Sequence, residues 1–144
     1  MGNLVFQEAK REKIWIKALL GGSSGSGKTY TALRLATGIA SKCGGDVVAI
    51  DTENGRIKYY AGEFKFKYLQ LTEPYTPEKY IEAIDAAVDA GFKVLILDSI
   101  SHEWTYCNDL HTSMPGNSWT NWSKITPRHN AFCEKILQSP IHVI

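Results

Sequence analysis

The chain has 144 residues, of which 44% are hydrophobic and 22% charged, the balance of one soluble globular domain. Its net charge of +1 excludes the strong basic excess of a protein dedicated to duplex DNA, and no apolar run is long enough to cross a membrane. Residues 1–13 lack the apolar core and the cleavage site of a secretory signal, so we expect an N-terminal extension on a cytoplasmic protein.

The cysteines give no framework for a disulfide or a zinc site. Cys43, Cys107 and Cys133 are odd in number and far apart, and they form no C-x-x-C pair. Cys107 and His111 stand four residues apart, but two ligands alone do not make a metal site. We therefore interpret the three cysteines as reduced thiols.

Segments typical of buried strands alternate with segments typical of amphipathic helices. Strands are expected at 14–20, 47–50, 64–71, 94–97 and 141–144, with 64–71 nearer the sheet edge. Helices are expected at 29–41, between the N-cap Thr76 and the stop at Gly91, and at 128–138, with a single turn at 57–61. Because right-handed helical crossovers join parallel strands, this alternation predicts an α/β domain over 14–144 with a mainly parallel central sheet.

A Gly/Ser-rich loop lies between the first predicted strand and the first predicted helix. The segment Gly22–Thr29 fits G-x-x-x-x-G-K-[ST] at every specified position. Glycines let successive N–H groups converge on phosphate oxygens, and the positive end of the following helix points at the same anion. The Lys28 ammonium reaches the β- and γ-phosphates, and the Thr29 hydroxyl is placed to coordinate Mg²⁺. We predict that ATP and Mg²⁺ bind at Gly22, Ser23, Ser24, Gly25, Ser26, Gly27, Lys28, Thr29 and the adjacent Tyr30.

Two predicted strands end in carboxylates. Asp98 follows the run Val-Leu-Ile-Leu, the Walker B arrangement, and is predicted to hold Mg²⁺ together with Thr29, while Ser99 helps to hold a metal-bound water. Glu53 follows the earlier strand end at Asp51 and is the candidate group that orients or deprotonates the attacking water. Glu103, five residues after Asp98, is the alternative base.

The order of these motifs resembles the RecA-like P-loop ATPase core. The blocks Gly-Ser-Gly-Lys-Thr-Tyr-Thr-Ala-Leu, Asp-Thr-Glu-Asn-Gly-Arg, Asp-Ser-Ile-Ser-His-Glu-Trp and Thr-Pro-Arg-His-Asn are similar to those of bacteriophage and prophage AAA-type ATPases, some associated with single-strand annealing and recombination. The resemblance implies a three-layer fold in which the fifth strand lies between the phosphate-loop strand and the Asp98 strand. It also implies water activation by Glu53 and a polar sensor residue beyond the fifth strand. Because the sequence ends at Ile144, before any such residue, we expect a C-terminally truncated core with weak activity in isolation.

Two further interpretations stay open beside an ATPase. A small-molecule or nucleotide kinase would use the same loop, although the chain has few arginines for a lid. For the ATPase itself, Arg56 is a possible arginine finger, supplied in trans within a homo-oligomer. An ATP-gated DNA-binding or assembly module with little turnover would use aromatic and basic groups to stack on single-stranded DNA. Packing of the tryptophans onto the sheet is the favoured alternative for these groups, which are Trp119, Trp122, Lys124, Arg128 and His129.

Overall fold

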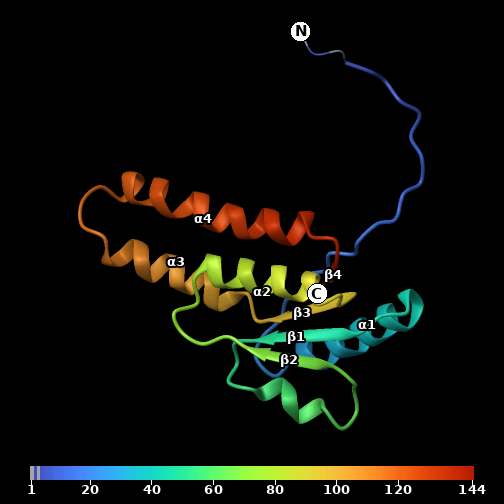
Figure 1. Ribbon diagram of the computed structural model, residues 1–144. Helices are drawn as coiled ribbons and strands as arrows, with labels where there is room; N and C mark the ends of the chain where they lie inside the picture. The colour runs from blue at the N-terminus through green and yellow to red at the C-terminus, as the bar shows by residue number, and fades with distance from the viewer. Residues whose placement is uncertain (1, 3) are drawn as a thin grey trace.

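A parallel sheet with helices on both faces forms the body of the protein (Figure 1). The computed structural model describes residue 2 and residues 4–144. The elements in chain order are α1 (Lys28–Cys43), β1 (Val47–Asp51), the 3₁₀ helix η1 (Arg56–Tyr60), β2 (Lys67–Gln70), α2 (Pro77–Asp89), β3 (Val94–Asp98), α3 (Ser101–Ser113), α4 (Ser118–Gln138) and β4 (His142–Val143). This arrangement confirms the predicted three-layer α/β fold.

The strands lie in the order β2-β1-β3-β4, and every pair is parallel. β1 and β3 are in register from Val47 beside Val94 to Asp51 beside Asp98, so the two strand ends stand next to each other. On its other side β4 meets the segment before the phosphate loop, where Lys17 bridges Val143. The predicted insertion of the last strand between that segment and the Asp98 strand is therefore confirmed.

The first predicted strand is wrong in extent and in burial. Of the expected range 14–20, only Lys17 pairs with a neighbour, and the side chains of Ile14 and Leu19 are 78% and 79% exposed. The segment lies at the edge of the sheet, and its partner β4 is only two residues long, so little backbone is available to pair with it. An apolar run does not distinguish an edge position from a central one.

Alternate side chains of the central strands supply two hydrophobic cores. On one face Val48, Ile50, Leu95 and Leu97 pack with Tyr80 and Ile84 of α2 and Phe132 of α4, and on the other Val47, Ala49, Val94 and Ile96 pack with Leu33 and Ala36 of α1. Because successive strand residues point to opposite faces, one apolar run such as Val94–Leu97 serves both cores. The two cores fix β1 and β3, whose carboxyl ends carry Asp51 and Asp98.

The elements between β1 and β3 follow the prediction closely. The Thr76 hydroxyl accepts a 3.2 Å hydrogen bond from the backbone N–H of Lys79, and Pro77 is the first residue of α2. The helix ends ahead of Gly91, whose φ of 83° is accessible to glycine at little cost. β2 pairs only with β1, as expected of an edge strand, and the predicted turn at 57–61 is the 3₁₀ helix η1.

The connection from β3 to β4 contains more helix than predicted. α3 was not predicted, because among its residues only Glu103 and Cys107 are buried and no apolar stripe marks it. α4 begins at Ser118, ten residues before the predicted start, and contains Pro127 in its interior. Its true N-cap is Asn117, whose side-chain oxygen accepts from the backbone N–H groups of Trp119 and Thr120. Among the described helices, none has the length and apolar character that a membrane crossing needs.

Candidate functional site

In the phosphate loop, Gly22–Thr29, glycine is favoured by the backbone conformation at two positions and by close packing at a third. Gly25 and Gly27 have φ values of 77° and 90°, in the left-handed region that disfavours other residues. At Gly22 an added Cβ would lie 2.6 Å from the Oγ atom of Ser26, so the two segments of the loop approach each other closely there. Gly27 is also the N-cap of α1, and the N-terminal end of this helix therefore opens into the loop.

Lys28 closes across the same loop. Its Nζ atom donates hydrogen bonds to the carbonyl oxygens of Gly22 at 2.7 Å and Ser23 at 2.8 Å. The ammonium thus lies at the first two residues of the loop, on a half-buried side chain. Tyr30 turns elsewhere: its ring packs edge-on against Tyr60 at 5.8 Å and Phe64 at 5.3 Å between centroids.

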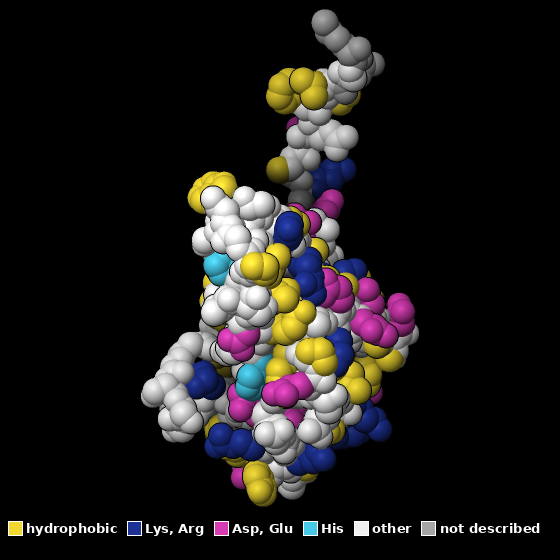
Figure 2. All heavy atoms as spheres, turned by 90° about the vertical axis from the view of Figure 1, so that its left-hand side faces the viewer, with side chains coloured by type: hydrophobic (Ala, Val, Ile, Leu, Met, Phe, Trp, Pro, Cys, Tyr) yellow, Lys and Arg dark blue, Asp and Glu magenta, His cyan; other side chains and the backbone are white. Residues whose placement is uncertain are grey.

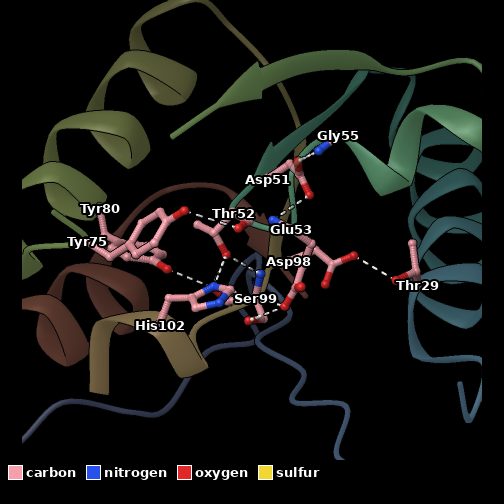
Figure 3. A network of polar contacts seen from close by, with 10 residues as sticks. All are labelled: Thr29, Asp51, Thr52, Glu53, Gly55, Tyr75, Tyr80, Asp98, Ser99 and His102. Atoms are coloured by element: carbon pink, nitrogen blue, oxygen red, sulfur yellow. Dashed lines mark hydrogen bonds and ion pairs between the residues drawn. The ribbon is translucent and has the colours of Figure 1, made fainter. Parts of the chain in front are cut away.

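Thr29 and Asp98 meet beside the loop. The Thr29 hydroxyl donates a 2.7 Å hydrogen bond to Oδ2 of Asp98 (Figure 3). Burial raises the pKa of the Asp98 carboxyl, and the nearby carboxylates of Asp51 and Glu53 raise it further, whereas the bond from Thr29 and the charge of Lys28 lower it. The net direction is upward, chiefly because burial disfavours the charged carboxylate.

Glu53 lies at the end of β1, next to the end of β3. The hydroxyl of Ser99 donates to its Oε1 atom at 3.2 Å, and about a third of the Glu53 side chain is exposed to solvent. Figure 3 shows Glu53, Asp98 and Ser99 together on the side of the strand ends that faces Thr29. The structure therefore brings together all four side chains predicted to surround the metal and the water.

Asp51 shapes the turn that carries Glu53. Its buried carboxylate accepts hydrogen bonds from the backbone N–H groups of Glu53 and Gly55 and from the hydroxyl of Tyr68. Burial raises the pKa of Tyr68 to about 12, and the bond to Asp51 contributes to the same shift. The Asp51 carboxylate is thus engaged in hydrogen bonds within the protein, and it holds the backbone that carries Glu53.

A second polar network joins the strand ends and was missed by the sequence reasoning. The Thr52 hydroxyl accepts a 3.0 Å bond from the N–H of Ser99 and lies 2.6 Å from Nδ1 of His102. The His102 ring stacks on Tyr75 at 4.8 Å, and its Nδ1 atom is 4.0 Å from Oε1 of Glu53. The available signal was positional: Thr52 and Ser99 each directly follow one of two adjacent strand ends.

Glu103, the alternative base, is not brought to the loop. Its carboxylate is 1% exposed and lies between α3 and α4, where it accepts hydrogen bonds from His129 and Cys107. Of the two carboxylates, Glu53 is the one that lies at the strand ends, bonded to Ser99.

A cavity of about 520 Å³ opens beside the loop. Its polar wall includes Lys28, Thr29, Asp98 and Ser99, and apolar side chains form the rest. The volume lies within the range of small-molecule sites, about 300–1,000 Å³. Four of the predicted phosphate and metal residues therefore border a space large enough for a ligand: Gly22, Lys28, Thr29 and Asp98.

Comparison with known proteins places the chain in a family. No curated protein matches the sequence. A family model described as an AAA domain matches residues 15–144, a range that includes the phosphate loop, Glu53 and Asp98. Proteins with such a domain are ATPases in general, which bind a nucleotide, usually with Mg²⁺. The match covers nearly the whole sequence, and the chain therefore belongs to this AAA domain family.

Proposed function

We propose that this protein binds ATP with Mg²⁺ on the loop Gly22–Thr29 and hydrolyses it to ADP and phosphate. The observation that carries the proposal is the 2.7 Å hydrogen bond between Thr29 and Asp98 at the wall of the 520 Å³ cavity. It joins the last residue of the phosphate loop to the carboxylate at the end of β3. A hydroxyl and a carboxylate are oxygen ligands of the kind that Mg²⁺ prefers, so the donor set suits this ion.

Different residues bind the phosphates and the metal ion. The backbone N–H groups of the loop and the Lys28 ammonium hold the phosphates, and Thr29 and Asp98 hold the metal ion. Bound Mg²⁺ would neutralise charge that develops on the phosphate oxygens. A bound cation would lower the pKa of Asp98, which burial raises, because it stabilises the charged carboxylate.

Glu53 supports the hydrolytic step. The Ser99 hydroxyl donates to Oε1 of Glu53, which fixes the carboxylate while Oε2 has no hydrogen-bond partner in the described structure. A water bound there attacks the γ-phosphorus, the bond from that phosphorus to the β,γ-bridging oxygen breaks, and the proton of the water passes to the carboxylate. Steady turnover follows when Glu53 returns this proton to solvent.

Two variants with matched controls test the proposal. Lys28→Ala is expected to weaken ATP binding or turnover by at least about 100-fold, whereas Lys42→Ala, at the other end of α1, leaves both unchanged. Glu53→Gln is expected to keep ATP binding and lose phosphate release, and Glu63→Gln is the exposed control. Unchanged ATP affinity and turnover in Lys28→Ala would contradict the assignment of the loop.

The acceptor of the phosphate separates hydrolysis from a kinase reaction. We expect phosphate to be released to water, and transfer to a nucleoside or small molecule would favour the kinase. Arg56 is exposed on η1 and remains the candidate finger for a neighbouring subunit, whereas Arg128 is held by both carboxylate oxygens of Glu78. Assembly in which one subunit completes the site of the next would make the specific activity rise with protein concentration.

Handling of single-stranded DNA, in a phage-type recombination role, is a second candidate function. Trp119 supports it, because its side chain is 86% exposed on α4. The other predicted groups are mostly engaged: Trp122 stacks on His111 at 4.1 Å, Arg128 pairs with Glu78, and His129 pairs with Glu103. On the face in Figure 2, acidic and basic side chains are interspersed and do not form a basic stripe.

Salt-dependent binding of a single-stranded oligonucleotide tests this second function. Trp119→Ala is expected to weaken binding, with a loss of about 1–3 kcal/mol for one stacked base. Leu137→Ala, which removes another exposed apolar side chain of α4, is the control. Equal binding by the wild type and Trp119→Ala would show that Trp119 does not stack on a base. That result would not bear on the proposed ATPase activity.

A further inference from the structure

Two facing helices bring four side chains of metal-binding types together, away from the phosphate loop. Glu103 and Cys107 lie four residues apart on α3, and His129 and Cys133 lie four residues apart on α4. Side chains with this spacing share one face of a helix. The helices α3 and α4 run next to each other (Figure 1), so the two pairs meet between them.

The distances show that three of these side chains converge on one point. Nδ1 of His129 is 2.9 Å from Oε2 of Glu103, and Sγ of Cys107 is 3.3 Å from Oε1 of the same carboxylate. The oxygen, nitrogen and sulfur atoms of the three residues all lie within 4.8 Å of one another. In a tetrahedral zinc site, ligand bonds of about 2.0–2.3 Å place neighbouring ligand atoms about 3.3–3.6 Å apart. The two printed distances, 2.9 Å and 3.3 Å, lie close to this spacing, and the separation of the His129 and Cys107 ligand atoms stays below 4.8 Å.

In this cluster a thiol lies against a buried carboxylate that already has a partner. The pair of Glu103 and His129 already satisfies a buried carboxylate, yet Cys107 points its thiol, a weak donor, at the same group. Glu103 and Cys107 are each only 1% exposed. If a metal displaced the proton of Cys107, the carboxylate and the resulting thiolate would carry two negative charges, which one divalent cation would balance.

We propose that Glu103, Cys107 and His129 form a binding site for one divalent transition-metal ion of the zinc class. Carboxylate oxygen, thiolate sulfur and imidazole nitrogen are the three ligand types that zinc uses in proteins. Binding breaks the S–H bond of Cys107, forms a bond from sulfur to the metal, and releases the proton to solvent. The His129 side chain is 27% exposed, so the imidazole can be reached from solvent.

The second nitrogen of His129 has its own partner. Nε2 lies 3.5 Å from Sγ of Cys133, and the ring packs edge-on against Trp104 at 5.0 Å. A histidine that binds a metal through one nitrogen commonly donates the N–H of the other, which fixes the tautomer and the ring orientation. Cys133 is thus a positioning residue for His129. His111 takes no part, because its Nε2 atom lies at Ser118 and its ring stacks on Trp122.

Titration of the metal-free, nucleotide-free chain with Co²⁺ tests the site, because a thiolate ligand gives Co²⁺ a charge-transfer absorption band. We expect the band to saturate at one ion per chain in the wild type and to be absent in Cys107→Ser. Cys133→Ser is expected to retain the band with affinity lowered about 10- to 100-fold. Cys43→Ser, on α1, is the matched control and should behave as the wild type. The phosphate loop cannot produce this band, since it contains no cysteine.

A second measurement tests the site independently, in case Cys107→Ser does not fold. Zn²⁺ is expected to raise the thermal unfolding temperature of the wild type and of Cys43→Ser, but not that of Glu103→Gln, which keeps an acceptor for His129. Far-UV circular dichroism before the titration establishes that each variant is folded. No thiolate band in the wild type, or a band that persists in Cys107→Ser, would overturn the proposal.

Discussion

Thr29 Oγ1 lies 2.7 Å from Asp98 Oδ2, although the two residues are 69 positions apart in the chain. Parallel strands produce this meeting: α1 begins beside the carboxyl edge of the sheet, where β3 also ends. A ligand site at that edge is expected of an open α/β sheet, because the loops that leave the strands gather there. The hydrogen bond therefore links the geometry of the fold to the proposed metal site.

Replacing Asp98 by Asn is expected to stabilise the free protein while impairing the proposed ATPase. Because the pKa of Asp98 is raised in the folded state, the folded protein binds this proton more tightly than the unfolded chain does. Stability from this group is therefore present below its unfolded pKa and is lost as pH rises through the folded pKa. Asp98→Asn removes that loss, and Asn retains an oxygen to accept from Thr29.

Urea unfolding at pH values from about 3 to 7 measures this difference, with the unperturbed aspartate pKa of about 3.9 as reference. The stability of the wild type should fall relative to that of Asp98→Asn as pH rises. In the same variant, turnover with Mg²⁺ should decrease by about 100-fold or more. A variant that is less stable than the wild type at neutral pH would contradict the assigned direction of the pKa shift.

Replacing glycine by alanine should have opposite effects on stability at Gly27 and at Gly38. At Gly27, with φ at 90°, alanine is strained by about 1–2 kcal/mol, although no atom lies within 4 Å of the added Cβ. Gly38 lies inside α1 with equally open space and no positive φ, so alanine there should stabilise the protein by about 0.5–1 kcal/mol. Denaturant unfolding of both variants measures the two free energies. Destabilisation by Gly38→Ala would contradict the helical placement of that residue.

Much of the fold followed from local signals in the sequence. The loop Gly22–Thr29, the cap at Thr76 and the stop at Gly91 each depend on a few adjacent residues, and the helices they delimit are where the sequence predicted them. The order of the strands was implied by family resemblance and is confirmed by pairing. Asp98 and Glu53 were singled out as strand-end carboxylates, which is also a local feature.

The features that were missed depend on contacts distant in sequence. α3 has no apolar stripe because the residues it buries, Glu103 and Cys107, are polar or small: Cys107 bonds to Glu103, and Glu103 pairs with His129 of α4. Pro127 is typical of a helix start, yet tertiary packing of Ile125 and Phe132 continues α4 through it. No spacing in the sequence could indicate that these two helices face each other.

The placement of α4 predicts unequal costs for two of its apolar residues. Phe132 is 2% exposed and packs on Tyr80 with ring centroids 5.0 Å apart, so Phe132→Ala should destabilise the protein by about 3–5 kcal/mol. Leu137, on the same helix, is 67% exposed, and Leu137→Ala should change stability by no more than about 0.5 kcal/mol. Urea unfolding monitored by circular dichroism compares the two variants. Equal costs would mean that α4 is rotated relative to the sheet.

The hydroxyl of Thr52 links the ends of β1 and β3, and its removal should affect both stability and turnover. Thr52→Val keeps the shape of the side chain but leaves the N–H of Ser99 without its acceptor, which costs about 1–3 kcal/mol in a buried position. It also frees His102, whose Nδ1 atom lies at the same hydroxyl, and so loosens the neighbourhood of Glu53. We expect lower stability in urea unfolding and slower phosphate release at unchanged ATP affinity.

Thr37→Val, on the exposed face of α1, controls for the loss of a hydroxyl as such. A Thr52→Val variant with wild-type stability would show that Ser99 finds another acceptor, and one with wild-type turnover would show that Glu53 does not depend on this network.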